Sequence, residues 1–251
     1  MKLNLTILTG AGISAESGIP TFRDSITGLW ENYKVEDVAT PEAFQRDPDL
    51  VHRFYNERRA KLTDVEPNAA HFALAELEKF WLDNKIGRFL LITQNIDNLH
   101  ERAGSQFVQH MHGELMKLRC DICHEVSDFS GDSSIETECP VCEIKGSMRP
   151  HVVWFGEMPL YMDFLEHALL KTDHFIAIGT SGTVMPASLF ADWVASNGRY
   201  SDLNEIVEIT KELSGNNAFT ITVEGNATEA VPEYTNVLME TLKERSENKG
   251  V

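Results

Sequence analysis

The chain begins with a short apolar run that leads directly into a glycine-rich turn. Residues Leu3 to Leu8 are followed by Thr9-Gly10-Ala11-Gly12-Ile13-Ser14-Ala15. A buried strand that enters such a turn is the usual start of a doubly wound α/β domain. The small residues of Gly10-x-Gly12-x-x-Ala15 permit a tight turn in which backbone amides approach a pyrophosphate. This start predicts a parallel sheet with a nucleotide site at the end of its first strand.

Apolar runs alternate with helical patterns along the rest of the chain. Further strands are expected at residues 89–93, 175–178, 206–210 and 218–223. Helices are expected from Pro41 onward and over residues 50–61, 71–80, 164–170, 187–195 and 233–243. This alternation predicts an α/β fold, a Rossmann-like doubly wound parallel sheet with helices on both faces.

Two stretches do not fit the alternation, and both are interpreted as insertions that together form a smaller lobe. We expect one domain over residues 1–251, with a large Rossmann-like lobe of residues 1–30, 69–118 and 150–251. The small lobe then consists of residues 31–68, which are helical, and residues 119–149, whose four cysteines predict a zinc ribbon. Since ligands of open α/β sheets bind at the carboxyl ends of the strands, the site is expected there, between the lobes.

Four cysteines occur as two pairs, Cys120/Cys123 and Cys139/Cys142. Two C-x2-C pairs fifteen residues apart have the spacing of a four-thiolate zinc site. Two disulfides are the alternative, which a reducing cytosol disfavours. Because four thiolates leave no open coordination position, the zinc is expected to be structural.

Composition excludes several classes of function. The formal net charge of −17 argues against a nucleic-acid partner, because phosphate contacts need clustered Lys and Arg. A solvated acidic surface explains this charge most simply, and lysine-rich protein segments would suit it as partners. The longest apolar stretches fall far short of the ~20 residues of a membrane helix, and no signal peptide opens the chain. We therefore expect a cytoplasmic protein without a membrane partner.

The glycine turn alone would suit a dehydrogenase equally well. Such an enzyme needs an acidic residue about 20 positions further on, at the end of a second strand. The corresponding residues Asp24-Ser-Ile-Thr-Gly-Leu-Trp30 follow no such strand. The dehydrogenase interpretation fails at this point.

The turn extends into a longer motif, Gly10-Ala-Gly-Ile-Ser-Ala-Glu-Ser-Gly-Ile-Pro-Thr-Phe-Arg23, that closely resembles the opening motif of sirtuins, the NAD-dependent protein lysine deacylases. The other sirtuin motifs follow in the family's order: Thr93-Gln-Asn-Ile-Asp-Asn-Leu-His100, His112-Gly113, the paired cysteines, Val152-Val-Trp-Phe-Gly-Glu157 and Gly179-Thr-Ser-Gly182. The resemblance covers nearly the whole chain. It implies that NAD is a consumed co-substrate, that nicotinamide is released, and that the acyl group passes from lysine to ADP-ribose.

The resemblance also implies roles for individual residues. His112 is the expected general base, because an imidazole of ordinary pKa near 6.5 can accept a proton at neutral pH. Asn95 and Asp97 are the other expected catalytic residues. NAD is expected to contact Gly10, Ala11, Gly12, Ser14, Ala15, Thr21, Phe22, Arg23, Trp30, Gln94, Asn95, Ile96, Asp97, Gly179, Thr180, Ser181, Thr210, Glu212 and Ala227. The acylated peptide is expected to add as a strand beside Val153, Phe155, Gly156 and Glu157.

Tyr55 and Arg58 resemble the Tyr-x-x-Arg pair of a sirtuin subgroup with bacterial members, the class III desuccinylases and demalonylases. Residues i and i+3 share one face of a helix, so a phenol and a guanidinium can meet one carboxylate. In isolation, the pair would be interpreted as a solvated arginine beside a half-buried tyrosine. Within the resemblance it predicts preference for acidic acyl groups, with acetyl also accepted.

Two positions depart from the family pattern. Thr210 stands where sirtuins usually have an asparagine for the adenosine ribose, with Glu212 at the acidic position and Asn204 as a rival for the same contact. Met185 stands where a tyrosine is frequent. Protein ADP-ribosyl transfer and a non-catalytic NAD- or acyl-lysine-binding module are the alternative functions. Protein targets and oligomeric state, a monomer included, stay open.

Overall fold

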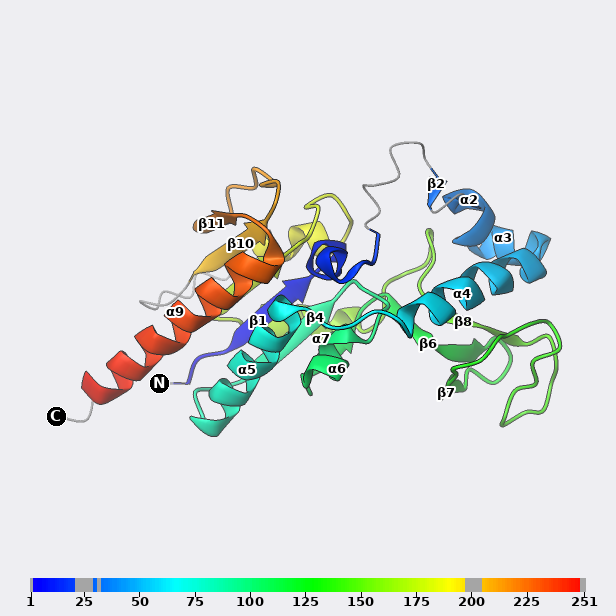
Figure 1. The fold of residues 1–251 in the computed structure, drawn as a ribbon, viewed down its shortest axis with the longest axis horizontal. Helices are drawn as coiled ribbons and strands as arrows, with labels where there is room; N and C mark the ends of the chain where they lie inside the picture. Colours follow the sequence, from blue (N-terminus) through cyan, green and yellow to red (C-terminus); the bar gives the residue numbers. More distant parts are fainter. Residues whose placement is uncertain (1, 21–28, 31–32, 197–204, 249–251) are drawn as a thin grey trace.

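A computed structural model describes residues 2–20, 29–30, 33–196 and 205–248, with the side chains of residues 29, 30 and 248 left out. Figure 1 shows a parallel sheet on one side and a smaller lobe on the other. The parallel strands are β1 (Leu5–Thr9), β4 (Phe89–Thr93), β5 (Val108–His110), β9 (His174–Ile178), β10 (Ile206–Thr210) and β11 (Ile221–Glu224). Their order is β11-β10-β9-β1-β4-β5, so the connections run to opposite sides from the boundary between β1 and β9. This doubly wound parallel sheet confirms the predicted fold class.

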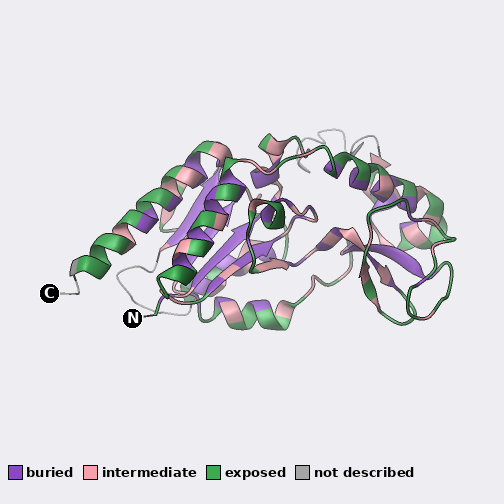
Figure 2. Cartoon of the chain, turned by 60° about the horizontal axis from the view of Figure 1, so that its bottom comes forward, coloured by how far each residue is buried: buried purple, intermediate pink, exposed green. Residues whose placement is uncertain are grey.

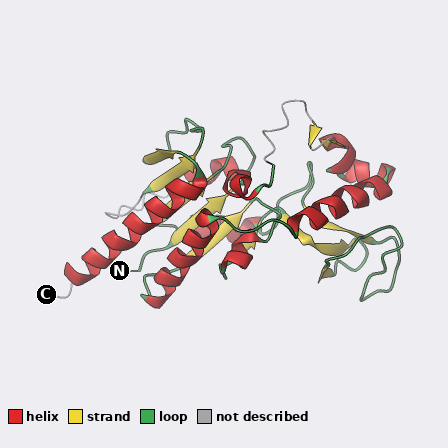
Figure 3. Ribbon diagram, in the orientation of Figure 1, coloured by secondary structure: helices red, strands yellow, loops and turns green. Residues whose placement is uncertain are grey.

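Helices cover both faces of the sheet, as Figure 3 shows. The helices of the described residues are α1 (Ala11–Ser14), α2 (Val35–Val38), α3 (Pro41–Arg46), α4 (Pro48–Leu62), α5 (Ala69–Asp83), α6 (Leu99–Ala103), α7 (Met162–Leu169), α8 (Phe190–Ser196) and α9 (Ala227–Asn248), of which α2, α3 and α4 belong to the small lobe. On β1, Leu5 and Ile7 join the core beneath α5 and α9, whereas Leu8 joins the core beneath α7 and α8. Because successive strand side chains point to opposite faces, both cores need apolar residues, and the central strands are buried throughout (Figure 2).

Local sequence signals explain where the small-lobe helices begin. Thr40 caps α3 by accepting a hydrogen bond from the amide of Ala43, and Asp47 caps α4 by accepting one from Leu50. Both helices have proline at their first position, where the missing amide costs nothing. Of all the helices in the described ranges, none is long and apolar enough to cross a membrane.

The small lobe contains an antiparallel sheet that the sequence did not predict. It comprises β7 (Val126–Asp128), β6 (Gly113–Cys120) and β8 (Met148–Val152) in the order β7-β6-β8. A further short pair joins β2 (Leu29–Trp30) to β3 (Tyr33–Lys34). Strands β6 and β8 continue across the expected lobe boundaries at 118/119 and 149/150, so the ribbon is tied directly to the segments beside the site.

Several expected elements have bounds shifted by a few residues, the last strand and the last helix among them. The last strand begins at Ile221 rather than residue 218, because Ala218 lies in a turn where its amide bonds the side-chain oxygen of Asn216. The last helix begins at Ala227 rather than Glu233 and includes Pro232. Both differences leave the order of elements unchanged.

Candidate active site

The sequence-predicted cofactor residues gather at one edge of the sheet. The loop that starts at Gly10 follows β1, Gln94 follows β4, and Gly179 follows β9. Strands β1 and β9 are neighbours at the point where the strand order reverses. This switch point is where open α/β sheets bind their ligands.

Three glycines let the β1 and β9 loops interlock. A Cβ atom on Gly12 would lie 2.6 Å from the Cα of Gly179, and one on Gly10 would lie 2.8 Å from the Gly179 carbonyl oxygen. Gly179 has a φ of +59°, which favours glycine. The amide of Gly12 donates to the Gly179 carbonyl at 2.9 Å. Gly12 therefore serves the close approach of two loops, and the expected pyrophosphate contacts of Ala11 and Gly12 stay predictions.

Ser14, Asn95 and Asp97 form a buried polar cluster beneath these loops. The Asn95 amide nitrogen donates to the Ser14 hydroxyl at 3.0 Å and to the Gly10 carbonyl at 3.2 Å. The Ser14 hydroxyl in turn donates to Asp97 at 3.0 Å. Burial raises the pKa of Asp97, while hydrogen bonds from Leu99 and Ser14 work in the opposite direction. The cluster fixes the conformation of the segment that carries Asn95 and Asp97, two of the three predicted catalytic residues.

The structure fixes the tautomer of His112. Its Nδ1 lies 3.0 Å from the carbonyl oxygen of Gln94. Since a carbonyl oxygen only accepts, Nδ1 carries the hydrogen and Nε2 keeps a lone pair. Burial lowers the pKa of His112, partly opposed by the Gln94 hydrogen bond, so the imidazole is neutral at physiological pH. The residue can therefore act as a base through Nε2.

Gly113 allows His112 to sit against strand β8. Its φ is +81°, and a Cβ there would lie only 2.1 Å from the carbonyl oxygen of His151. The amide of Val153 donates to the His112 carbonyl at 2.9 Å. The His-Gly sequence is thus explained by a close backbone approach that links the predicted base to the predicted substrate segment.

Neighbouring histidines have other roles. Nε2 of His110 lies 2.7 Å from Glu101, and its Nδ1 lies 3.1 Å from the carbonyl of Asn95. Burial lowers the pKa of His110, but the hydrogen bond and charge of Glu101 outweigh burial, and the net shift is upward. His100 is buried with its Nε2 3.0 Å from the hydroxyl of Thr9, and burial holds its pKa well below the ordinary value. His110 and His100 thus belong to the structural polar network.

The predicted substrate segment contains one well-exposed stretch and one clamped carboxylate. Phe155 is exposed, although its amide already donates to the Ala39 carbonyl at 3.0 Å. Glu157 instead accepts two hydrogen bonds from Arg149, at 2.8 and 3.0 Å, and one from the amide of Trp154 at 2.8 Å. Burial raises the pKa of Glu157, but these hydrogen bonds outweigh burial and lower it. The carboxylate therefore holds this segment in shape, a role that the sequence did not suggest.

Tyr55 and Arg58 lie on the face of α4 that packs into the small lobe. Tyr55 is fully buried, and its oxygen accepts a hydrogen bond from the indole nitrogen of Trp154 at 2.9 Å. The guanidinium carbon of Arg58 lies 3.3 Å from the ring centre of Phe54, whose carbonyl accepts one of its hydrogens at 3.0 Å. Burial raises the pKa of Tyr55 well above its ordinary value, and the positive charge of Arg58 opposes that shift. Arg58 is therefore near enough to act electrostatically on the phenol.

The residues expected to contact the adenosine part of NAD differ in their burial. Thr210 is buried at the end of β10, whereas Glu212 is exposed in the turn that follows. Ala227 is buried at the start of α9, and Thr180 and Ser181 are partly exposed after β9. Several predicted positions lie outside the described residues: Thr21, Phe22, Arg23, the side chain of Trp30, and Asn204.

The four cysteines come together as predicted. Their sulfur atoms all lie within 4.8 Å of one another, with Cys120 to Cys142 at 3.7 Å and Cys123 to Cys139 at 3.5 Å. A disulfide would need about 2.05 Å. Zinc–sulfur bonds of about 2.3 Å in a tetrahedron place the sulfurs roughly 3.8 Å apart, which these separations match. The cluster fits a structural zinc ion and not two disulfides.

Comparison with known proteins identifies the family. A sequence profile described as the Sir2 family matches residues 10–186. The chain belongs to the Sir2 family. It is 52% identical over 243 residues to an NAD-dependent protein deacylase of Yersinia pestis, covering 96% of this chain and 84% of that protein. It is 49% identical to an NAD-dependent protein deacylase of Rhodopirellula baltica, covering 93% of this chain and 98% of that one.

Solved structures of Sir2 proteins share the fold. A Sir2 homologue in complex with NAD superposes with a TM-score of 0.82 at 38% identity, covering 95% of this chain and 90% of the other. A Sir2 protein in complex with a p53 peptide and NAD⁺ superposes with a TM-score of 0.74 at 26% identity, covering 95% and 92%. The parallel sheet, the cysteine cluster and the loops at the switch point are therefore features of a Sir2 fold.

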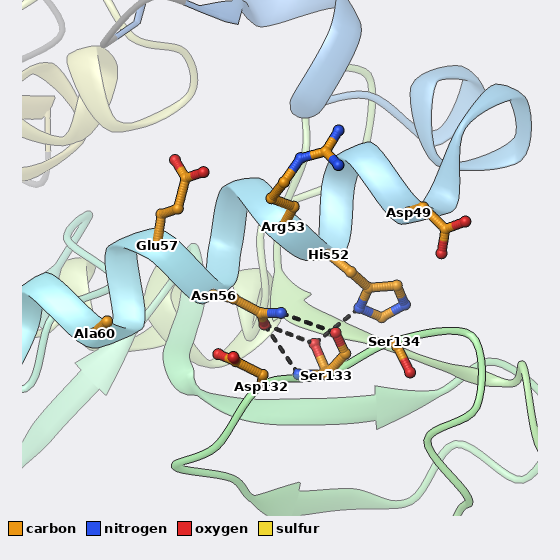
Figure 4. A pocket seen from close by; sticks show the side chains of 9 residues that line it. All are labelled: Asp49, His52, Arg53, Asn56, Glu57, Ala60, Asp132, Ser133 and Ser134. Atoms are coloured by element: carbon orange, nitrogen blue, oxygen red, sulfur yellow. Dashed lines mark hydrogen bonds between the residues drawn. The ribbon is translucent and has the colours of Figure 1, made fainter.

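This Sir2 chain also has a surface cavity of about 360 Å³ between α4 and the ribbon (Figure 4). In its wall, Asn56 donates to the Ser133 carbonyl at 2.9 Å and accepts from the Ser133 amide at 3.0 Å. Nδ1 of His52 lies 2.8 Å from the Ser133 hydroxyl. None of the sequence-predicted site residues lines this cavity. These bonds join α4, which carries Tyr55 and Arg58, to the zinc ribbon.

Proposed function

We propose that this chain is an NAD-dependent protein deacylase that removes acyl groups from lysine side chains in peptides and proteins and favours acyl groups that end in a carboxylate. The observation that carries the proposal is the neutral imidazole of His112, tethered to the Gln94 carbonyl at the edge where the switch-point loops meet. The deacylase names of the relatives and the peptide and NAD⁺ complex of a Sir2 protein support the same conclusion.

Different residues of this chain bind NAD, accept a proton and bind the peptide. When bound, NAD supplies an electrophilic ribose carbon and a nicotinamide leaving group. Asn95 and Asp97, held by Ser14, orient the ribose and carboxamide side of the site. Nε2 of His112 accepts the proton of a ribose hydroxyl, since Nδ1 is committed to Gln94. The peptide lies along Phe155 and Gly156, where main-chain pairing gives loose sequence selectivity.

The acidic-acyl preference rests on two donors with complementary properties. Burial keeps the Tyr55 hydroxyl protonated, so it can donate to a carboxylate. Arg58, one helical turn away, offers a permanent positive charge and a planar donor fork that fits a carboxylate. An acetyl group presents no carboxylate for either residue to contact. We therefore expect succinyl and malonyl groups to gain from both residues and acetyl from neither.

Variants of His112 test the reaction. In His112→Ala, NAD and acylated peptide should still bind, whereas deacylation and the accompanying nicotinamide release should collapse. Adenine-labelled NAD distinguishes the alternative of protein ADP-ribosyl transfer, because label would then remain on the target protein without deacylation. Full activity in His112→Ala would refute the assignment of the base.

Variants of Arg58 test the acyl preference. Arg58→Met should lower kcat/KM for a succinyl peptide by ~30-fold to over 1000-fold, because truncating one partner of a buried charged pair costs ~2–5 kcal/mol. The acetyl form of the same peptide should change little. Arg53→Met is the matched control, since Arg53 is exposed on the same helix. Equal losses on acetyl and succinyl peptides would contradict the preference.

A further inference from the structure

One hydrogen bond links the predicted acyl-contacting helix to the substrate segment. The indole nitrogen of Trp154 donates to the phenol oxygen of Tyr55 at 2.9 Å, across 99 positions of sequence. An indole N–H can only donate, so the phenol oxygen is the acceptor in this bond. A phenol has a single hydrogen, and the bond to Trp154 does not use it. The hydroxyl hydrogen of Tyr55 is therefore available to another acceptor.

The Tyr55 side chain has little freedom to turn that hydrogen elsewhere. It is fully buried, and the Phe54 ring packs edge-on against it with a centroid distance of 4.9 Å and an interplanar angle of 84°. The centre of the Trp154 ring lies 6.5 Å from the centre of the Tyr55 ring. Burial raises the pKa of Tyr55, so the hydroxyl keeps its hydrogen at neutral pH. The phenol is thus a protonated donor with its oxygen held in place.

Trp154 is itself held by charged groups. Its side chain is buried, and the guanidinium carbon of Arg149 lies 3.3 Å from its ring centre. Arg149 makes two hydrogen bonds to Glu157, which also accepts the Trp154 amide. The Phe44 ring packs at 5.3 Å. The indole is fixed at its ring and at its backbone, so its N–H has a defined direction.

We propose that Trp154 is a positioning residue that sets acyl selectivity through Tyr55. By donating to the phenol oxygen, the indole leaves the hydroxyl hydrogen as the donor to the carboxylate of a succinyl or malonyl group. A hydroxyl that accepts one hydrogen bond becomes a better donor in the next, which strengthens the contact. The inference rests on the proposed acidic-acyl preference. It adds a residue that acts on the carboxylate only through another side chain.

The test measures kcat and KM separately for succinyl and acetyl forms of one peptide, with the full chain at saturating NAD. Trp154→Phe removes the donor and keeps an aromatic ring. We expect KM for the succinyl peptide to rise about 3- to 10-fold, the size of effect expected for one neutral hydrogen bond, and kcat/KM for the acetyl peptide to change less than about twofold. Trp193→Phe, on α8, is the matched control and should change neither.

The double variant connects the two residues. Tyr55→Phe removes the hydroxyl, so Trp154→Phe should cause no further loss of succinyl activity in that background. If Tyr55→Phe leaves the succinyl-to-acetyl ratio unchanged, the proposed acyl preference itself fails. If Tyr55→Phe lowers the ratio but Trp154→Phe does not, or lowers both substrates equally, the positioning role alone is overturned.

A second measurement does not depend on a folded Trp154 variant. The chain has four tryptophans, whose indole N–H resonances can be assigned with Phe variants at the other three positions. The Trp154 resonance should shift in Tyr55→Phe, and it should shift further on addition of succinyl peptide with NAD than on addition of the acetyl form. An unchanged Trp154 resonance in Tyr55→Phe would overturn the proposal.

Discussion

Gly113→Ala isolates the close backbone approach that holds His112. The new methyl group would lie 2.1 Å from the His151 carbonyl oxygen and 3.0 Å from the Val152 Cα, at a φ of +81°. A left-handed conformation costs a non-glycine residue about 1–2 kcal/mol, and overpacking costs a further 1–3 kcal/mol or so. The sum of about 2–5 kcal/mol is a large part of a typical stability of about 5–15 kcal/mol.

Gly104→Ala supplies the matched control. Gly104 has a φ of +108°, but a Cβ there meets only the Ala75 Cβ at 3.8 Å, which is ordinary contact. This variant should therefore lose only the conformational part, about 1–2 kcal/mol. At about 2–4 °C per kcal/mol, the melting temperature should fall by roughly 4–20 °C in Gly113→Ala and by roughly 2–8 °C in Gly104→Ala.

Thermal unfolding followed by circular dichroism measures the difference, and kcat on an acylated peptide reports the position of His112. We expect kcat to fall in Gly113→Ala well beyond the change in Gly104→Ala. Equal effects of the two variants on stability and on kcat would refute the argument that the close approach of β8 requires a glycine after His112.

Three other expectations follow from the site. Since burial lowers the pKa of His112, its basic form persists below pH 6.5. We therefore expect kcat/KM to fall with decreasing pH around a midpoint below 6.5. A midpoint above 6.5 in the pH–rate profile would contradict the assignment of His112 as the base. We expect one zinc ion per chain in the unaltered protein and less than one in Cys142→Ser, as measured by atomic absorption. An unchanged zinc content in this variant would argue against binding by four thiolates. Asn56→Ala removes its bonds to Ser133 and should destabilise the protein by about 1–3 kcal/mol in thermal unfolding, and a loss no larger than in Arg53→Ala would count against that link.

The sequence was most informative where chemistry and structure coincide. The strand at Leu5–Thr9 is an apolar run that ends in glycines, and the cysteine pairs have a spacing that few folds use for anything but zinc. The doubly wound parallel sheet also followed from the alternation of strands and helices. These features depend on local residue types, so a single sequence reveals them.

The small antiparallel sheet was not predicted because its strands lack the residue pattern that is typical of strands. Strand β8 is Met-Arg-Pro-His-Val, yet all five residues are buried. Arg149 is accommodated there by stacking on Trp154 and pairing with Glu157, eight positions away. Such compensation depends on tertiary contacts, which hydrophobic periodicity does not report. The same holds for the Trp154 bond to Tyr55, although Trp154 lies inside a motif that the sequence displays.

The most direct test of the proposed function is an NAD-dependent assay on acetyl, malonyl, succinyl and glutaryl forms of one peptide. Mass spectrometry would follow the deacylated peptide, and nicotinamide would be quantified in the same reaction. We predict one nicotinamide released per acyl group removed, none without acylated peptide, and higher kcat/KM for the acyl groups that carry a carboxylate. Nicotinamide release with label transferred to protein and no deacylated peptide would contradict the account.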